Sequence, residues 1–246
     1  MEFCIILQAR LGSKRFPEKI IKKIYKKETS LSFIIKRVKK FNFNLIVATT
    51  ISKKDDKIVN ICKKNNINYF RGSENNVFER YNKAAKKYKI KNIIRLTSDC
   101  PLIDFYLLKK MQKEYLKKKL DYICNTLPIE KSTFPNGSDI EIFKSSLLSK
   151  YKKLSKSDKE HVTNKFWKSK KIKKKTITNN INLSKLRYTL DYKSDLFVIK
   201  KILLYLNKKN KKITYKNISK FLNKNKRIST INQQFNKIFQ GRKING

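Results

Sequence analysis

The 246-residue chain has little glycine, proline, cysteine or histidine, and each shortage excludes a class of protein. Its five glycines and four prolines form no linker that would divide the chain, and neither the P-loop nor the GxGxxG signature occurs. The four cysteines are far apart and lack a CxxC spacing, which favours a reduced cytosolic protein over disulfides or a zinc site. The sequence has no apolar run near the ~18 residues of a membrane span, and no basic leader followed by a long apolar core. We therefore expect a cytoplasmic protein without a membrane span.

Acidic residues are also scarce. The 18 Asp and Glu stand against 62 Lys and Arg, which gives a formal net charge of +44. Such a charge is typical of proteins that bind nucleic acid or an anionic membrane surface. The excess is almost entirely Lys, however, and Lys, Asn and Ile replace Arg, Ala and Val along the chain, as expected of an AT-rich genome. Because the lysines are spread over every expected helix, compositional bias explains them better, and a basic nucleic-acid-binding protein remains a distant alternative.

Apolar runs alternate with helical periods through the first half of the chain. Short buried runs predict strands, and an apolar spacing of i, i+3 and i+4 between them predicts helices. The expected strands are 3–7, 45–50, 68–70 and 93–96, and the expected helices begin after an N-cap at Ser30, at Asp55–Asp56, near Val77 and after Asp104. This alternation predicts a mostly parallel sheet with helices on both faces. The chain is long enough for the core of one such domain.

The second half of the chain is less regular. Its expected strands are 122–124, 140–143, an edge strand at 173–178 and a last strand at 186–191. Its expected helices are one that starts in a capping box at 157–160 and continues through Trp167, and one from Asp195 to about Leu206. We expect one α/β domain over residues 1–207, with a less regular insertion at 130–180, followed by a C-terminal helix and polar tail over 208–246.

The first expected strand ends in a cationic loop. Residues 8–19 contain a Gly, a Ser, two Arg and two Lys, and Pro17 ends the loop in an extended or turn conformation. Ligands of α/β sheets bind at the carboxyl ends of the strands, where backbone N–H groups and Arg or Lys side chains satisfy phosphate oxygens. From spacing alone, a polyphosphate site and a solvated loop after a core strand are equally good interpretations.

The loop sequence QARLGSKRFPEK, residues 8–19, resembles the Q-A-R-x-G-S-x-R-x-P-G-K signature of the cytidylyltransferases of sugar activation. This family includes the acylneuraminate and Kdo cytidylyltransferases and the SpsF-like branch of spore coat polysaccharide biosynthesis. Glu18 replaces the family's Gly. Further segments at 71–81, 95–103 and 190–196 resemble family elements in the family's order. The resemblance implies an α/β nucleotide-diphospho-sugar transferase fold (GT-A/Rossmann-like), with three layers and a mixed, mainly parallel sheet.

The resemblance also implies roles for residues of this chain. It assigns Arg10 and Lys19 to the triphosphate, and Asp99 and Asp191 to Mg²⁺, which takes only one or two protein carboxylates. Without the resemblance, each of these aspartates reads as a residue of a turn or a helix start, and Asp195 reads as a helix cap. The implied catalytic residues are Lys19, Arg10 and Asp99. The implied nucleotide-binding residues are Gln8, Ala9, Arg10, Gly12, Ser13, Arg15, Lys19, Arg71, Thr97 and Ser98.

Two more segments, 135–141 and 160–163, resemble the P-x-G-x-D-x-E and E-H-V-T elements of the SpsF-like branch. They make Asp139, Glu141 and His161 candidates for binding hydroxyls or an amine of an acceptor. A strand-edge turn explains the two acidic residues equally well, and a lone His on a helix is more often structural.

The predicted function is Mg²⁺-dependent transfer of CMP from CTP to a sugar or sugar acid, with release of pyrophosphate, for polysaccharide assembly. The expected partners are CTP and the acceptor, without nucleic acid, and a homodimer is the candidate oligomer. A glycosyltransferase of the same fold, which uses a nucleotide sugar as donor, is the nearer alternative.

Overall fold

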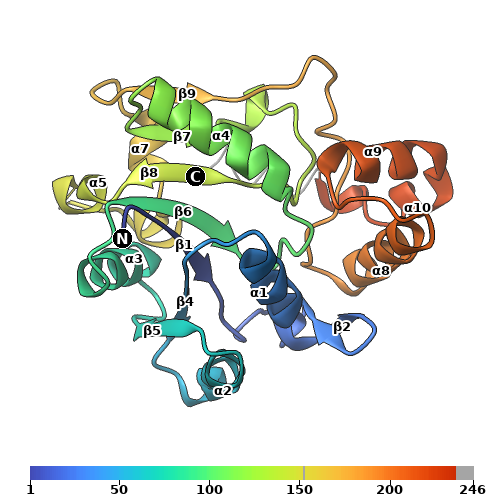
Figure 1. Cartoon of the computed structure of the whole chain (residues 1–246), viewed down its shortest axis with the longest axis horizontal. Coiled ribbons are helices and arrows are strands. Elements are labelled where there is room, and N and C mark those ends of the chain that lie inside the picture. Colours follow the sequence, from blue (N-terminus) through green and yellow to red (C-terminus); the bar gives the residue numbers. More distant parts are fainter. Residues whose placement is uncertain (152, 237–246) are drawn as a thin grey trace.

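The computed structural model describes residues 1–151 and 153–236, and a twisted sheet runs through its centre (Figure 1). Within these described residues the sheet has seven strands in the order β5–β4–β1–β6–β8–β7–β9. The strands are β1 Phe3–Gln8, β4 Leu45–Thr50, β5 Asn68–Gly72, β6 Asn92–Thr97, β7 Tyr122–Cys124, β8 Glu141–Lys144 and β9 Lys174–Thr176.

The sheet is mixed and mainly parallel, as predicted. Strands β5, β4, β1 and β6 are parallel to one another, β8 is antiparallel to both β6 and β7, and β9 is parallel to β7. The carboxyl ends of β1, β4 and β6 therefore meet at one edge of the sheet, where a ligand of such a fold binds. The predicted edge strand is confirmed as β9, which is the last strand in the order.

Helices cover both faces of the sheet, as the alternation predicted. The helices are α1 Ser30–Lys40, α2 Asp56–Lys64, α3 Val77–Lys87, α4 Phe105–Lys117, α5 Ser146–Lys150, α6 Lys156–Glu160, α7 Asn164–Lys168, α8 Lys193–Lys208, α9 Tyr215–Lys224 and α10 Lys226–Thr230, with 3-10 turns at Lys19–Ile21, Lys53–Asp55 and Ile129–Lys131. Side chains of α1, α2 and α4 share a core with Ile5 and Leu7 of β1, while α3, α5 and α7 pack with Cys4 and Ile6. This split follows from the alternation of side chains along a strand.

A further hydrophobic cluster joins α8 and α9 to the rest of the molecule. Its members include Phe16 of the cationic loop, Ile24 of a small hairpin and Leu186. The hairpin, β2 Lys23–Tyr25 and β3 Glu28–Thr29, was not predicted from the sequence. In Figure 1 the α8–α10 group lies at one end of the molecule, beside the loops that leave the sheet edge. The expected domain division at residue 207 stays a prediction, and residues 237–246 of the expected tail lie outside the described residues.

The prediction of a last strand at 186–191 was wrong. Its backbone is extended, but its hydrogen bonds go to different segments rather than to one partner strand. The N–H of Tyr188 donates to the carbonyl of Asn136, whereas the N–H of Leu190 donates to the carbonyl of Asp99. The result is one isolated bridge, between Asn136 and Arg187.

The single helix predicted from 157 through Trp167 was also wrong. The chain forms α6, then a turn, then α7, because His161 leaves the helical conformation, with φ −103° and ψ 83°. Val162 and Thr163 of the turn are buried. The capping box lies earlier than predicted, with Ser155 as N-cap and Asp158 as its partner.

The N-cap predicted at Ser30 is likewise one residue off. Thr29 caps α1, and the buried Ser30 hydroxyl instead donates to the carbonyl of Ser98 at 2.6 Å.

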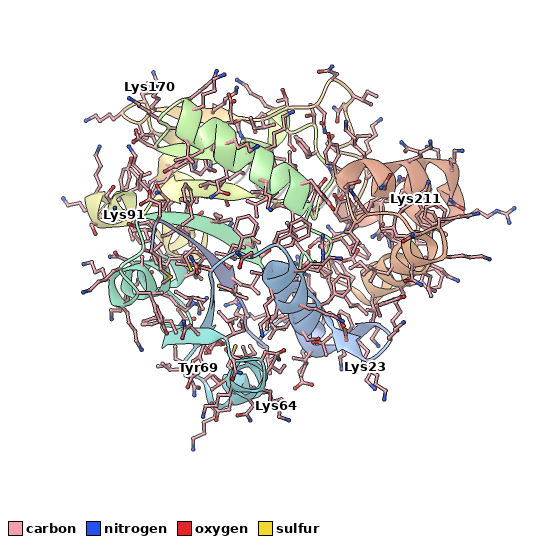
Figure 2. All side chains as sticks on the ribbon, viewed as in Figure 1. Lys23, Lys64, Tyr69, Lys91, Lys170 and Lys211 are labelled. Atoms are coloured by element: carbon pink, nitrogen blue, oxygen red, sulfur yellow. The ribbon has the colours of Figure 1, made fainter. Side chains whose placement is uncertain are left out.

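Lysine side chains extend from elements all round the molecule (Figure 2). The labelled Lys23, Lys64, Lys170 and Lys211 lie on widely separated parts of it. In the part of the chain that the structure describes, no helix combines the length and the hydropathy that crossing a bilayer requires.

Candidate functional site

The cationic loop is fixed to the sheet edge by a buried carboxylate. Asp55 is 2% exposed, and its Oδ1 accepts a hydrogen bond of 2.8 Å from the N–H of Leu11 in the loop. Its Oδ2 accepts from the hydroxyls of Thr49 and Thr50 at the end of β4, at 3.0 and 2.6 Å. One carboxylate therefore joins the loop after β1 to the end of β4. The sequence indicated only that Asp55 begins a helix.

The loop backbone turns through a left-handed residue just before Lys19. Glu18 has φ 55° and ψ 21°, a conformation that favours glycine, and this is the position where the resembled signature has Gly. Its carboxylate pairs with Lys57 at 2.6 Å, and this hydrogen bond lowers the pKa of Glu18. A glutamate thus adopts a left-handed backbone conformation at the position where the signature has Gly. The turn directs Lys19, which is 8% exposed, into the interior.

Lys19 bridges the two aspartates on which the predicted metal site rests. Its Nζ lies 2.8 Å from Oδ2 of Asp99 and 2.7 Å from Oδ1 of Asp191. Burial alone would lower the pKa of Lys19, but its ion pairs with Asp99 and Asp191 outweigh burial and raise it. Burial alone would likewise raise the pKa of Asp99, and the Lys19 ammonium reverses that effect and lowers the pKa to about 2. Three residues distant in the sequence therefore meet as charged groups at the carboxyl edge of the sheet.

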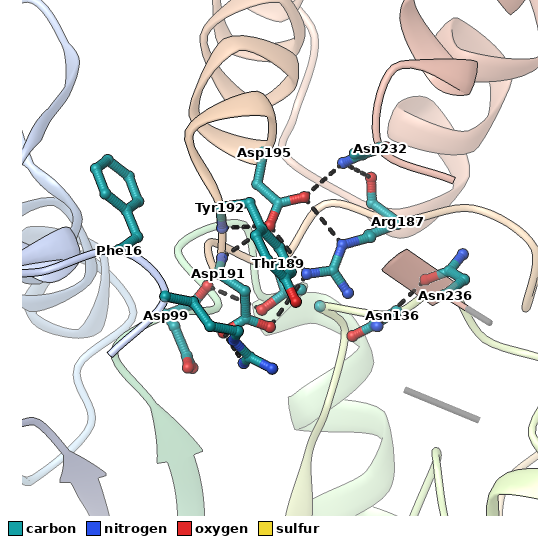
Figure 3. Close-up of polar contacts among 12 residues, drawn as sticks. Phe16, Asp99, Asn136, Arg187, Thr189, Asp191, Tyr192, Asp195, Asn232 and Asn236 are labelled. Atoms are coloured by element: carbon teal, nitrogen blue, oxygen red, sulfur yellow. Dashed lines mark hydrogen bonds and ion pairs between the residues drawn. The ribbon is translucent and has the colours of Figure 1, made fainter. Parts of the chain in front are cut away.

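Asp191 has further cationic partners (Figure 3). Arg15 Nη2 lies 3.0 Å from its Oδ1, and Arg187 Nη2 lies 3.1 Å from its Oδ2. Arg187 is 2% exposed and also forms a double hydrogen bond to Asp195, at 2.9 Å to each oxygen. Asp195 in turn accepts from the N–H groups of Asp191 and Tyr192. Asp195 therefore contributes to capping α8, as predicted, from the N3 position of a capping box with Tyr192 at the N-cap. The role of Arg187 was not predicted from the sequence.

Backbone contacts join the segment of Asp99 to the neighbouring loops. The N–H of Ser98 donates to the carbonyl of Gln8 at 3.0 Å, and the carbonyl of Asp99 accepts from the N–H of Leu190 at 2.7 Å. The carboxyl end of β6 is thereby fixed to both β1 and the segment before Asp191. Thr97 is the last residue of β6, and its hydroxyl helps to lower the pKa of Asp99, after the larger effect of Lys19.

The remaining residues of the predicted phosphate loop lie at or near the same edge. The N–H of Ala9 pairs with the carbonyl of Ala48, and the side-chain oxygen of Gln8 lies 3.5 Å from Arg95. Ser13 stabilises the loop, because its hydroxyl accepts from the N–H of Phe16 at 3.4 Å. Near Gly12, an added Cβ would meet only the Glu74 carboxylate, at an ordinary 3.4 Å.

Arg71 binds protein groups in this structure. Its guanidinium donates to the carbonyls of Thr50 and Ser52 at 2.9 and 2.8 Å, and it pairs with Asp56 at 2.6 Å. These contacts fix the loop after β4. A contact of Arg71 with the nucleotide stays a prediction.

Arg10 connects the loop to the predicted acceptor segment 160–163. Its Nη2 lies 3.9 Å from Glu160 Oε1, and both side chains are exposed, at 36% and 59%. His161 follows as the C-cap of α6 and is exposed. The fold thus brings Arg10 and the Glu160–His161 pair to one region.

Asp139 and Glu141 differ in their surroundings. Asp139 is half-buried and accepts from the Thr126 hydroxyl at 2.9 Å and from the N–H of Gly137 at 3.2 Å. It lines a cavity of about 30 Å³ together with Thr126 and Asn136. Glu141 is 2% exposed, and its oxygens accept from Arg95 at 2.5 Å and from the Tyr122 hydroxyl at 2.6 Å. A role of either carboxylate toward an acceptor stays a prediction.

The carboxylates of Asp99 and Asp191 fit Mg²⁺ in donor type and in number. Both have an oxygen within 2.8 Å of the same ammonium nitrogen, so a single positive charge reaches both. Mg²⁺ is bound through one or two carboxylates and completes its coordination with phosphate oxygens and water. Across residues 1–151 and 153–236, no group of three or more His, Cys, Asp or Glu side chains forms a self-sufficient metal site. Asp99 and Asp191 are thus the residues that would hold a metal here.

Comparison with known proteins points to one family. The cytidylyltransferase family model matches residues 4–241. An uncharacterized protein of Methanocaldococcus jannaschii is 36% identical over 167 residues, which are 66% of this chain and 66% of that protein. The spore coat polysaccharide biosynthesis protein SpsF of Bacillus subtilis is 32% identical over 173 residues, which are 66% of this chain and 68% of SpsF. The chain thus matches about two thirds of the length of each of these relatives.

Solved structures agree with these relatives. A cytidylyltransferase from Leptospira borgpetersenii superposes with a TM-score of 0.83 at 36% identity, over 93% of this chain and 97% of that chain. The CMP-2-keto-3-deoxy-manno-octonic acid synthetase, solved as a complex with CTP, has a TM-score of 0.62 at 13% identity, over 83% of this chain and 99% of its own. This second likeness shows the fold alone.

Proposed function

Because the chain belongs to the cytidylyltransferase family, we propose that it transfers CMP from CTP to a sugar or sugar acid and releases pyrophosphate. The observation that carries the proposal is the ion-pair cluster of Lys19, Asp99 and Asp191 at the carboxyl edge of the sheet. The match to the cytidylyltransferase family supports the choice of nucleotide, and a relative named for spore coat polysaccharide biosynthesis supports the choice of product.

In the proposed reaction, a hydroxyl oxygen of the acceptor attacks the α-phosphorus of CTP and forms a new P–O bond. The bond from that phosphorus to the oxygen shared with the β-phosphate breaks, pyrophosphate leaves, and the hydroxyl proton passes to water. Such transfers need little covalent chemistry from the protein, so positioning and electrostatics account for the rate. Mg²⁺ bound by Asp99 and Asp191 would supply positive charge at the α-phosphate.

The cationic side chains of the loop are the proposed ligands of the triphosphate. We assign Arg10 and Lys19 to its oxygens, with Arg15 and Ser13 in support, because charged donors bind phosphate strongly. Asp55 keeps the loop at the sheet edge through the N–H of Leu11.

Asp139 and His161 are the proposed ligands of the acceptor. Asp139 accepts hydrogen bonds in this structure and is half-buried, which suits a partner of sugar hydroxyls. Glu141 does not contact the acceptor in this proposal, because both of its oxygens already accept from protein donors. Its role is to hold Arg95 in place. The four free cysteines are all buried, and we place the enzyme in the cytoplasm, where thiols stay reduced.

The test is pyrophosphate release by the purified protein with each of CTP, UTP, ATP and GTP and a panel of sugars and sugar acids. We expect release with CTP and one class of acceptor. Asp99→Asn and Asp191→Asn should each lower the rate at least about a hundredfold and leave the circular dichroism spectrum unchanged. Asp121→Asn is the matched control, because Asp121 lies outside the cluster and pairs with Lys144. Undiminished release by both cluster variants would refute the assignment of the aspartates.

The same assay separates the alternatives. A glycosyltransferase would release a nucleoside diphosphate from a nucleotide sugar and no pyrophosphate from CTP. A nucleic-acid-binding protein would bind DNA or RNA with an affinity that falls steeply with salt.

A further inference from the structure

The last described residues of the chain lie against the segment that contains Asp191 (Figure 3). The ring of Phe235 stacks on Tyr192, with ring centroids 3.7 Å apart and planes 10° apart. The side-chain amide of Asn232 donates to Asp195 Oδ1 at 2.8 Å, and Asn232 is fully buried. Asn236 donates to the carbonyl of Lys185 at 2.8 Å. We call residues 232–236 the closing segment.

The closing segment is connected to Oδ2 of Asp191 through the buried ion pair of Arg187 and Asp195. Arg187 donates to this oxygen at 3.1 Å, and the rest of its guanidinium is fixed by the double hydrogen bond to Asp195. Asn232 contacts both members of that pair, since its amide also lies 3.4 Å from the carbonyl of Arg187. The orientation of Arg187 therefore depends on a residue 45 positions later in the chain.

The closing segment is connected to Oδ1 of Asp191 through aromatic contacts. Arg15 pairs with this oxygen at 3.0 Å, and its guanidinium carbon lies 5.1 Å from the centre of the Tyr192 ring. Tyr192 is fixed in turn by the stacked ring of Phe235. Each oxygen of Asp191 thus has an arginine partner whose position depends on the closing segment.

We propose that Asn232 and Phe235 are positioning residues, which orient the Asp191 carboxylate for the metal and the triphosphate. The inference rests on the proposed function, because it takes Asp191 as a ligand of the divalent cation. Groups that orient a metal-binding carboxylate typically change metal affinity about 10–100-fold when they are removed. Phe235 is one contact further from Asp191 than such groups, so its loss should lower the affinity for the metal by only about fivefold.

The variant Phe235→Leu removes the ring stack and keeps an apolar side chain at this half-buried position. Phe221→Leu is its matched control, because Phe221 stacks on Tyr205 in the neighbouring α8–α9 layer at 4.5 Å and 25°. Among the described residues, the ion-pair partners of Asp191 are Arg15, Lys19 and Arg187, and neither residue of that stack is one of them. Both variants should melt at a lower temperature than the wild type, so the melting temperature alone does not test the proposal.

The deciding measurement is a titration of the full chain with Mn²⁺ in the presence of α,β-methylene-CTP. Electron paramagnetic resonance detects the free Mn²⁺ at each step. We expect the dissociation constant for Mn²⁺ to rise about fivefold in Phe235→Leu, to return to the wild-type value in Phe235→Tyr, and to stay unchanged in Phe221→Leu. Asn232→Ala should raise the dissociation constant for Mn²⁺ by at least as much, because Asn232 contacts the buried pair of Asp195 and Arg187 directly.

Wild-type affinity for Mn²⁺ in both Phe235→Leu and Asn232→Ala would overturn this inference and leave the proposed function standing. A wild-type protein that binds no Mn²⁺ with the nucleotide analogue would overturn the proposed function, and this inference with it.

Discussion

Removing the Lys19 ammonium should reverse the way the stability of the protein depends on pH. In the wild type, Lys19 lies between the carboxylates of Asp99 and Asp191. The pKa of Asp99 is lowered to about 2 from 3.8, with Lys19 outweighing the opposing effect of burial. A shift of that size corresponds to about 2 kcal/mol of stability. Because the folded-state pKa is the lower one, this stability is present above pH 4 and is lost as the pH falls toward 2.

Lys19→Met leaves the two carboxylates facing each other without the shared cation. Breaking a buried ion pair by removal of one partner typically destabilises a protein by about 3–5 kcal/mol. Arg15 and Arg187 remain on Asp191, so we expect a loss at the lower end, about 3 kcal/mol at pH 7. Repulsion between the carboxylates should raise the pKa of one of them above its unfolded value. The variant should therefore gain stability, relative to the wild type, as the pH falls from about 7 to about 5.

The assay is urea unfolding of both proteins at pH 7 and pH 5, with the midpoint and slope compared. Lys57→Met is the matched control, because the Lys57 side chain is 62% exposed and its pair with Glu18 lies at the surface. The control should unfold with nearly the wild-type midpoint at both pH values. A Lys19→Met protein as stable as the wild type at pH 7, or one that shows no relative gain at pH 5, would refute the bridging role of Lys19.

Three further substitutions test other parts of the site. Glu141→Gln leaves Arg95 in the interior without its charged partner and should lower the free energy of unfolding by about 3 kcal/mol in urea titrations; a loss below about 1 kcal/mol would contradict the buried pair. Gly137 has φ 106°, and an added Cβ would lie 2.5 Å from the backbone nitrogen of Thr189. Gly137→Ala should therefore lower both the melting temperature and the rate of pyrophosphate release, and an unaffected variant would show that the turn can shift freely. Glu18→Gly should raise the melting temperature by about 2 °C in calorimetry, since glycine adopts the left-handed conformation without strain. A lower melting temperature would mean that the ion pair with Lys57 stabilises the protein more than the strain at Glu18 destabilises it.

The sequence predicted those parts of the fold that depend on local patterns. The first four parallel strands and the helices between them follow from buried apolar runs and helical periods, and the structure has them within a few residues. The convergence of Asp99 and Asp191 was predicted through the family resemblance, since they are 92 positions apart and the fold alone brings them together.

What the sequence did not predict depends on contacts between distant segments. The hydrogen bond from Leu11 to Asp55 spans 44 positions and has no local signal. Segment 186–191 reads as a strand, but its hydrogen bonds go to two neighbours rather than one, so no ladder forms. The arginine partners of Asp191 were missed for the same reason, because a charged residue in a Lys-rich chain does not indicate which carboxylate it meets.

The central claim is that Asp99 and Asp191 bind one divalent cation beside the cationic loop. A crystal structure of the protein with CTP and Mn²⁺, with the ion located by its anomalous signal, tests it most directly. We predict one Mn²⁺ within about 2.3 Å of a carboxylate oxygen of each aspartate, with the triphosphate between the ion and Arg10. A Mn²⁺ bound by the nucleotide but distant from both aspartates would contradict the account.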